Sequence, residues 1–431
     1  MPDPGRPEAA GSVSGAGPGI RLGDRVHHAR KRFFLGTHRT ATPEETLERI
    51  RPHLLACGIT RLADVTGLDR IGIHTVLGHR PNSPTLSNSA GKGFSLAAAT
   101  VSAAMEGIEL FHAETVGLPP VECAWNDLPA DGHIPVERLA GTRHGAFRTD
   151  LAEHWVWGWD LIGGRPAAAP WTAVAMLGPP GGRGLRNLFA MGTNGLASGN
   201  HILEAVAAAL YEVIERDAVA CWRYAGNRHG ILTPRVALET VDSPAVQDLV
   251  RRFAAAGIVP LLYDVTADTG VPTYMAIVYD KDFRHGGMYR GYGTHLEPAV
   301  AMCRALTEAV QSRLVLIAGS RDDHFRRDVL RNQGADTPAQ VAGLEAAPAT
   351  VHGRAHPDRS TPTFEGDIAV LLGCLRRVGI EQAIAFDLTK PEMGIPVARV
   401  VVPGLEGYNF DFYTPGARPV AFAEALRAGA A

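Results

Sequence analysis

One sequence unit occurs three times in this chain. It consists of a helix, the dipeptide Gly-Ile, a strand that ends in Asp, a turn and a second strand. The copies span 44–80, 246–280 and 366–403, and their glycines are Gly58, Gly257 and Gly379. A Gly after a helix suits the left-handed conformation that closes it, and Asp followed by Thr suits a tight turn. Three unrelated α-β-β segments would share some of these features. The near-constant spacing favours a true repeat and predicts an α+β (mixed α/β) fold.

Three alanine-rich stretches with helical periodicity, 95–116, 200–224 and 297–318, alternate with these units. Each carries polar side chains on one narrow face: Ser102, Glu106 and Glu109 on the first, Asn200, Glu204, Glu212 and Glu215 on the second, and Arg304, Glu308 and Gln311 on the third. Carboxylates in apolar surroundings cost several kcal/mol unless they are paired or bind a metal. We therefore expect the three helices to meet at a shared cleft, with the sheets outside, around a hard divalent cation.

Glycine-rich turns precede two of these helices. The segment 192–200 (GTNGLASGN) leads into the second helix, which we expect Ser198 or Asn200 to cap. Lys92 stands between two glycines before the first helix. Helix N-termini and lysines both bind phosphate, although the Lys92 segment lacks the spacing of a Walker A loop.

These features combine into one hypothesis, which is Mg-ATP binding on a fold without a P-loop. The metal would be held by Glu106, Glu109, Glu212, Glu215 and Glu308, and the phosphates by Lys92, Arg304 and the 192–200 turn. For any single acid, a solvated helix face or a core ion pair is an equally ordinary explanation. A di-iron helical bundle is the rival metal site, because Glu109 is followed by His112 at the required spacing. It would need a second Glu-x-x-His pair, where this chain has Glu212-x-x-Glu215, and all-oxygen ligation favours magnesium.

Composition limits the remaining possibilities. The 431 residues predict one large or two fused domains. A net charge of −3 gives no reason to expect nucleic acid, and no run reaches the roughly 18 apolar residues that a membrane span needs. Five cysteines without a CxxC pair indicate a reducing cytoplasm. We expect residues 1–25 to be a disordered leader, 319–365 to be a polar surface excursion, and 411–431 to be a C-terminal tail around a main domain at 26–410.

The motifs together resemble the YcaO superfamily. The resemblance rests on TRLADVTGLDRIGIHTV, RPNSPTLSNSAGKG, SAAMEGIELFHAE, TNGLASGNHILEAVAAALYEVIERDA, RALTEAVQSRL and SRDD, over about 57–323, and on the later PVARVVVPGLEG. It implies an ATP- and magnesium-dependent enzyme that phosphorylates a backbone amide oxygen of a peptide. Carried over by position, the family motifs fall on Ser102, Glu106, Glu109, Asn200, Glu204, Glu212, Glu215, Arg216, Arg304 and Glu308. Leu110 stands where many relatives have an arginine.

The same resemblance implies several products. A side-chain nucleophile of the peptide gives an azoline, an external sulfide gives a thioamide and an amine gives an amidine. The motifs look most like YcaO proteins that work with a TfuA-like partner in thioamide formation, and the chain is without a fused leader-binding domain or a proline-rich end. The resemblance also implies a possible homodimer. A docking scaffold with a vestigial ATP site remains the alternative that is not an enzyme.

Overall fold

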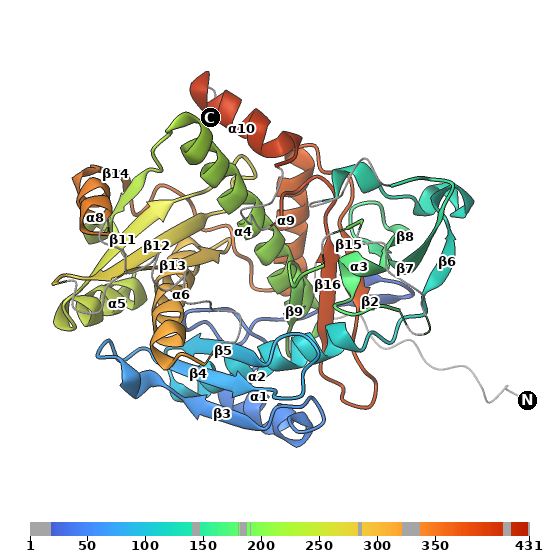
Figure 1. Cartoon of the computed structure of the whole chain (residues 1–431), viewed down its shortest axis with the longest axis horizontal. Helices are drawn as coiled ribbons and strands as arrows, with labels where there is room; N and C mark the ends of the chain where they lie inside the picture. Colours follow the sequence, from blue (N-terminus) through green and yellow to red (C-terminus); the bar gives the residue numbers. More distant parts are fainter. Residues whose placement is uncertain are drawn as a thin grey trace, which may run out of the picture.

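Each predicted unit forms part of its own sheet in the computed structural model (Figure 1). The structure describes residues 19–139, 147–179, 181, 188–189, 191–282, 287–320, 337–407 and 415–429. The first unit consists of α1 (Pro43–Ile50), β3 (Arg61–Asp64), β4 (His74–His79), β5 (Asn88–Gly93) and α2 (Leu96–Glu114). Its sheet has the antiparallel order β3-β4-β5.

The second unit has the same order of elements and a larger sheet. It consists of α5 (Pro244–Ala255), β11 (Ile258–Asp264), β12 (Thr273–Asp280), β13 (Met288–Thr294) and α6 (Pro298–Ala318). The strand order is β13-β12-β11-β10-β14, which adds β10 (Arg235–Ala237) and β14 (Ala349–His352). The β10–β14 pair is parallel.

The third unit takes its helix α4 from an earlier part of the chain. It consists of α9 (Phe364–Arg377), β15 (Ile384–Asp387) and β16 (Val397–Val401), completed by β9 (Leu196–Ser198) and α4 (Ile202–His229). The strand order is β6-β7-β15-β16-β9, in which β8 also pairs with β7. The added elements are β6 (Val121–Ala124), β7 (Ala152–Asp160), β8 (Arg165–Pro170) and the short α3 (Trp171–Val174).

The repeat is confirmed by its turns. The glycines that follow α1, α5 and α9 all have positive φ, at 76° for Gly58, 64° for Gly257 and 77° for Gly379. In each turn a threonine N–H donates to the aspartate two residues earlier: Thr66 to Asp64, Thr266 to Asp264 and Thr389 to Asp387. The threonine hydroxyl then accepts an N–H at the start of the next strand, from Thr75, Thr273 and Val397. The fold is therefore the mixed helix and sheet arrangement that the sequence predicts, with one local structure used three times.

The helices α2, α4 and α6 join the units in a cycle. Each packs on the edge strand that precedes it and also contacts an edge strand of another unit: α2 contacts β9, α4 contacts β13 and α6 contacts β5. Figure 1 shows the three sheets arranged around these helices. The helices can approach because their partners are glycines: a Cβ on Gly91 would lie 2.1 Å from Ala103 N, and one on Gly293 would lie 2.1 Å from Ala301 O. The alanines and glycines of these segments thus set the distance between helix and sheet.

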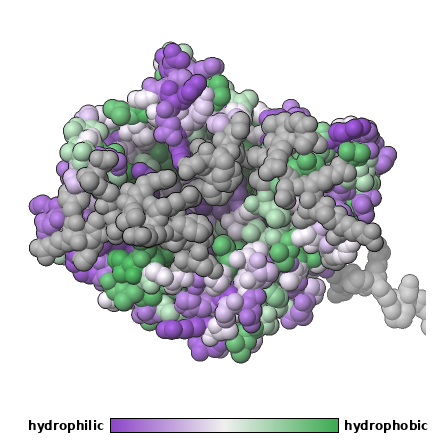
Figure 2. Space-filling view, in the orientation of Figure 1, coloured by the Kyte–Doolittle hydropathy of each residue, from purple (hydrophilic) through white to green (hydrophobic). Residues whose placement is uncertain are grey.

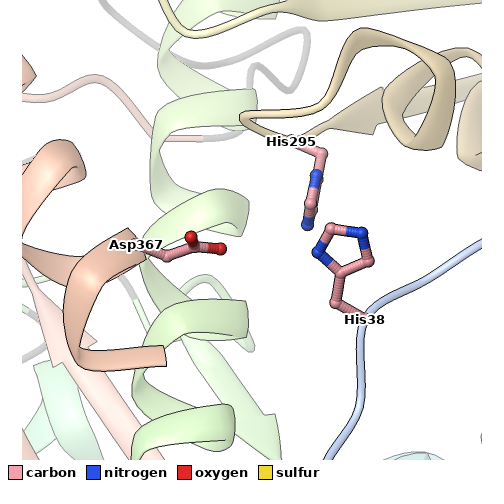
Figure 3. A group of neighbouring side chains, drawn as sticks. All are labelled: His38, His295 and Asp367. Carbon is pink, nitrogen blue, oxygen red and sulfur yellow. The ribbon is translucent and has the colours of Figure 1, made fainter. Parts of the chain in front are cut away.

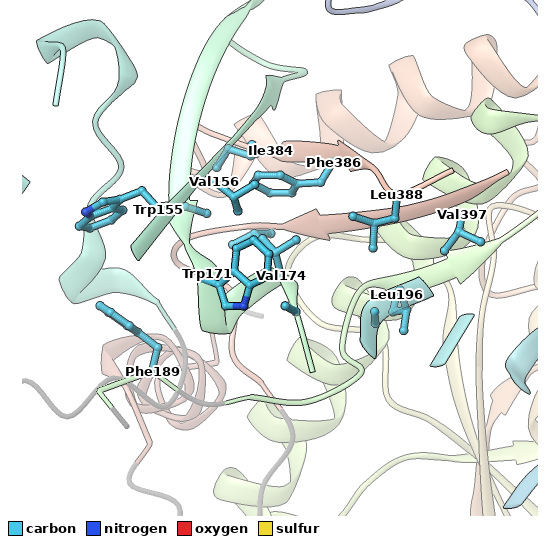
Figure 4. Close-up of a cluster of buried hydrophobic side chains, with 14 of the residues drawn as sticks. Trp155, Val156, Trp171, Val174, Phe189, Leu196, Ile384, Phe386, Leu388 and Val397 are labelled. Atoms are coloured by element: carbon cyan, nitrogen blue, oxygen red, sulfur yellow. The ribbon is translucent and has the colours of Figure 1, made fainter. Parts of the chain in front are cut away.

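A large apolar core lies against the third sheet (Figure 4). Trp155 and Val156 of β7 are fully buried, and Phe386 of β15 is 1% exposed. Leu196 of β9 belongs to the same cluster. Ala197 of β9 and Ala398 and Val400 of β16 belong to a second cluster, which packs them against α4, the helix that carries four of the predicted site residues.

The predicted flanking segments are partly described. Residues 1–18 of the expected leader lie outside the described residues, and Ile20–Leu22 forms β1, which pairs with β2 (Arg25–His27). Within the expected surface excursion, 321–336 lies outside the described residues, whereas α8 (Thr337–Ala346) and β14 are part of the fold. Residues 411–414 and 430–431 of the expected tail are likewise outside, and α10 (Ala417–Arg427) packs on α4.

The surface gives two further observations. Across the described ranges, no helix combines the length and hydrophobicity that crossing a bilayer requires. In Figure 2, hydrophilic residues form the tip at the end of α10, and hydrophobic residues are scattered among hydrophilic ones on the rest of the coloured part of this face.

Candidate functional site

Glu106 and Glu308 occupy matching places in the first two units. Glu106 Oε2 accepts the Ala90 N–H at 2.9 Å, and Glu308 Oε1 accepts the Tyr292 N–H at 3.3 Å. Each carboxylate therefore lies midway along its helix and against the edge strand of its own sheet. The helical spacing that predicted these acids also produces their equivalent positions.

Glu109 joins the first unit to the third. Its Oε1 accepts the Ser198 N–H at 2.8 Å and the Ser198 hydroxyl at 2.6 Å. Burial raises the Glu109 pKa to about 8, the Ser198 bonds oppose this rise, and the nearby Glu106 and Glu212 carboxylates reinforce it. The structure therefore brings the acids of α2 and α4 close enough to repel one another.

Glu212 and Glu215 lie on α4 with Arg216 between them. The NH2 group of Arg216 is 3.6 Å from Glu212 Oε1, and its NH1 group is 3.7 Å from Glu215 Oε1. Burial raises the pKa of both acids despite Arg216, and that of Glu215 reaches about 7. The Glu308 carboxylate raises both pKa values further, which places α6 at the same cluster.

Two predicted cations complete the cluster. Lys92 Nζ donates to Glu308 Oε2 at 2.8 Å. Burial opposes ionisation of Glu308, but Lys92, Arg216 and Arg304 outweigh it and lower the Glu308 pKa. Arg304 Nε is buried and has no hydrogen-bond partner among the described residues. The five predicted acids and three predicted cations thus meet at one place, where α2, α4 and α6 converge.

Asn200 and Glu204 contact a segment that the sequence did not point to. Asn200 Oδ1 accepts from Arg49 at 2.6 Å and from the Thr46 hydroxyl at 2.9 Å. Glu204 Oε2 accepts from the N–H and hydroxyl of Thr40 at 2.9 and 2.8 Å. These contacts bring the chain that leads into α1 against the start of α4.

Arg39 belongs to the same segment and also faces the cluster. Its Nε is 3.6 Å from Glu204 Oε1. Burial lowers the Arg39 pKa, the Glu204 and Glu109 carboxylates raise it, and Arg304 lowers it. The only sequence signal for this segment is the capping box of Thr42 and Glu45, which marks the start of α1 and says nothing of a binding role.

Arg399 is a second cation that the sequence did not identify, although it lies in the PVARVVVPGLEG motif. Its Nε donates to Ala173 O at 3.0 Å and its NH2 group to Gly192 O at 2.8 Å. Burial lowers the Arg399 pKa to about 10, and the nearby Glu212 opposes this fall. The strand β16 therefore presents a guanidinium to the acids of α4.

The N-cap of α4 and the two predicted serines, Ser198 and Ser102, lie as follows. The N-cap of α4 is His201, whose side chain accepts the Leu203 N–H at 3.2 Å, so the prediction of Ser198 or Asn200 as the cap is wrong. Ser198 instead ends β9 and binds Glu109. Ser102 lies on α2 one turn before Glu106 and is half-buried.

His112 does not support a di-iron site. Its Nδ1 bonds to Ile108 O at 2.7 Å, and the side chain is fully buried. Burial is the largest cause of the pKa shift of both side chains, but the charges that act on the pKa of His112 are Lys390, Glu392 and Asp387, whereas those that act on the pKa of Glu109 are Glu106 and Glu212. The two side chains of the Glu-x-x-His pair therefore face different surroundings.

A buried polar group lies beside the acidic cluster. His38, His295 and Asp367 point toward one another (Figure 3), with potential ligand atoms within 4.8 Å of one another. Lys31 Nζ lies 2.6 Å from Asp367 Oδ2 and 2.9 Å from His38 Nδ1. Because an ammonium group already fills this space, these side chains hold Lys31 and anchor the segment that carries Arg39.

The cluster fits magnesium and a nucleotide. Its acids supply only oxygen donors, which magnesium prefers, and the raised pKa values of Glu109 and Glu215 indicate carboxylates that a cation would stabilise. The buried, unpartnered Arg304 Nε is a donor available to an anion. Bound Mg²⁺ would be held by the five acids, and the phosphates by the surrounding cations.

Comparison with known proteins agrees with this chemistry. Residues 90–406 match the family described as YcaO cyclodehydratase, ATP- and Mg²⁺-binding. A Methanothermobacter thermautotrophicus protein is 36% identical over 86% of this chain and 95% of its own length. A Rhizobium leguminosarum bv. trifolii protein, named for its place in the tfuA 3′ region, is 33% identical over 85% of this chain and 88% of its own length.

Solved structures share the fold. YcaO from Methanopyrus kandleri, bound with AMPPCP and Mg²⁺, has a TM-score of 0.67 and 25% identity, and the match covers 89% of this chain and 99% of that protein. A heterocyclase in complex with substrate and cofactor has a TM-score of 0.75 and 22% identity over 90% of this chain. This chain spans about half of that heterocyclase, 55% of its length.

The family match covers most of the chain, and the relatives match it over nearly their full lengths. The prediction of an ATP- and magnesium-dependent enzyme is confirmed at the level of the family. This chain belongs to the YcaO family of ATP- and Mg²⁺-binding enzymes.

Proposed function

We propose that this enzyme activates a backbone amide of a peptide or protein by transferring the γ-phosphoryl group of ATP to the amide oxygen, and that the product is a thioamide. The observation that carries the proposal is the meeting of Glu106, Glu109, Glu212, Glu215 and Glu308 with cations at the junction of α2, α4 and α6. An amide oxygen is a poor leaving group, and phosphorylation makes it a good one. An attacking sulfide can then replace it as phosphate.

The residues of the cluster have distinct roles in this proposal. The five acids hold Mg²⁺, which supplies charge neutralisation on the transferred group. Lys92, Arg216 and Arg304 bind phosphate oxygens. Ser102 on α2, Glu204 on α4 and Asn200 just before α4 contact the rest of the nucleotide, with Arg39 beside Glu204.

Support for the thioamide product comes from a relative. The Rhizobium protein is named for its position next to tfuA, and it matches this chain over most of both lengths. We therefore propose a TfuA-like protein as the partner that supplies or directs sulfur. The cysteines of the described structure are all free thiols, which supports action in the reducing cytoplasm.

An azoline-forming reaction is the second candidate, because the family is described as a cyclodehydratase and one structural neighbour is a heterocyclase. An amidine-forming reaction would use the same activated amide with an amine nucleophile.

Mass spectrometry separates these outcomes. The enzyme is incubated with Mg-ATP, a peptide encoded beside its gene, sulfide and the TfuA-like protein. We expect a mass gain equal to exchange of oxygen for sulfur, and none when ATP is omitted. Loss of water would instead indicate cyclodehydration, to an azoline or to an amidine with an amine of the peptide. An unchanged peptide without peptide-dependent ADP release would support a docking scaffold and contradict the proposal.

A further inference from the structure

Arg399 is a buried cation with one unused donor. The residue is 3% exposed, and its Nε and NH2 groups are held by the carbonyls of Ala173 and Gly192 at 3.0 and 2.8 Å. The NH1 group is buried and has no hydrogen-bond partner in the part of the chain that the structure describes. A buried donor without a partner is destabilising, and more so when it is charged. Such a group therefore calls for a ligand that supplies an acceptor.

The charge of Arg399 is also left without a close counter-ion. Glu212 influences it electrostatically, yet no carboxylate of the described residues forms an ion pair with it within 4.0 Å. Lys92 and Arg216 differ in this respect, since Lys92 lies 2.8 Å from Glu308 and Arg216 contacts both Glu212 and Glu215. Arg399 thus offers a fixed positive charge whose orientation is set by two neutral carbonyls before any ligand binds.

The surroundings indicate which ligand fits. Glu212 is one of the acids that we propose for Mg²⁺, and Arg216 and Arg304 lower its pKa as Arg399 does. An anion that lies beside a metal-binding carboxylate and among several cations matches a phosphate group that shares the metal. A neutral amide would leave the charge of Arg399 uncompensated.

We propose that Arg399 NH1 donates to the phosphoryl group while it is transferred, so that Arg399 is a catalytic residue supplied by β16. This inference rests on the proposed function. In the step concerned, the substrate oxygen forms a bond to the γ-phosphorus. The bond from that phosphorus to the bridging oxygen breaks, and its electron pair leaves with ADP. Because Arg399 is already anchored, it stabilises the transferred group without reorganisation, which is the condition for a large electrostatic effect.

Binding of a transition-state mimic tests this role without a peptide. The affinities of wild type, Arg399→Gln and Arg399→Lys are measured for Mg-ADP alone and for Mg-ADP with orthovanadate, by calorimetry. We expect Arg399→Gln to change the Mg-ADP affinity by less than about threefold and to weaken the vanadate complex about 100-fold, since loss of one preorganised donor costs about 10² to 10³ in rate. Arg399→Lys keeps the charge and should recover part of the vanadate affinity.

The matched control is Arg376→Gln, because Arg376 also donates to a backbone carbonyl, Ile162 O at 3.0 Å, but is exposed. It should bind both ligands as wild type does. Equal losses of Mg-ADP and vanadate binding in a folded Arg399→Gln variant would overturn the inference and make Arg399 an ordinary nucleotide contact. Unchanged vanadate affinity would overturn it as well. If wild type bound no Mg-ADP at all, the proposed function would fail together with the inference, and that result differs from a defect limited to Arg399.

Discussion

Lys92 Nζ and Glu308 Oε2 lie 2.8 Å apart, so a cation from the sheet of the first unit neutralises an acid on the helix of the second. The pair lies where α6 contacts β5, which is one of the three contacts that join the units. It is partly exposed, with 20% and 25% of the two side chains accessible. An ion pair of this exposure adds little to the stability of the fold. The pair instead positions two charges at the junction of the first two units.

Lys92→Met should lower the affinity for Mg-ATP about tenfold, the effect of losing about 1.4 kcal/mol of charge interaction with phosphate. The melting temperature should change little. Lys390→Met is the control, because Lys390 donates to Thr115 O outside the cluster. Calorimetric titration with Mg-AMPPCP gives the affinities, and equal behaviour of the two variants would argue against a phosphate contact by Lys92.

Glu106→Gln and Glu215→Gln should each abolish magnesium-dependent ATP turnover and leave the fold intact. Glutamine keeps the shape and hydrogen bonds of the side chain but removes a charged metal ligand. The control is Glu424→Gln on α10, where the side chain is exposed. ADP release and circular dichroism are measured together. Normal turnover in both site variants would show that the metal does not depend on these acids.

Lys31→Met should destabilise the protein by about 3–5 kcal/mol, because it leaves the Asp367 carboxylate buried without its counter-ion. Both side chains are fully buried in the native protein. The double variant Lys31→Met, Asp367→Asn should recover much of the loss, because the neutral amide can still accept from Thr361, and the exposed Lys281→Met should be neutral. Urea unfolding measures these changes. A wild-type stability that falls on addition of a chelator would instead indicate a metal between His38, His295 and Asp367.

Glu406→Gln should change the pH dependence of stability. Burial, reinforced by Asp217, raises the Glu406 pKa to about 7 from an ordinary value of 4.5. The native state therefore holds a proton that the unfolded chain releases, and stability is lost as pH rises from about 4.5 to 7. Glutamine removes this loss, so the variant should gain up to about 3 kcal/mol over wild type at pH 8 and nothing at pH 4. Parallel unfolding curves of both proteins at all pH values would contradict the assignment.

The sequence predicted the parts of the site that follow helical periodicity. Glu106, Glu109 and Glu308 recur at intervals set by the 3.6-residue period, and their apolar surroundings indicated burial. The turns of the repeat could also be predicted from the sequence, because Gly58, Gly257 and Gly379 adopt the positive φ that glycine favours after a helix. These features depend on neighbours in the chain.

The remaining site residues depend on packing between distant segments. Arg39 meets Glu204, and Arg49 meets Asn200, across more than 150 positions of sequence. Arg399 lies in the apolar strand β16, and the sequence around it contains no spacing of polar residues that would mark it as part of a site. The wrong prediction of the α4 N-cap also results from distant contacts. Ser198 belongs to β9 because it pairs with Val397 and donates hydrogen bonds to Glu109.

We propose that the acids of α2, α4 and α6 hold magnesium against the phosphates of ATP. A crystal structure of the protein with Mg²⁺ and AMPPCP tests it most directly. We predict metal density about 2.0–2.1 Å from carboxylate oxygens of Glu106, Glu109, Glu212, Glu215 or Glu308, with the triphosphate on the same ions. Nucleotide bound elsewhere, with these five side chains still paired to Ala90 N–H, Lys92, Arg216 and Ser198, would contradict this proposal.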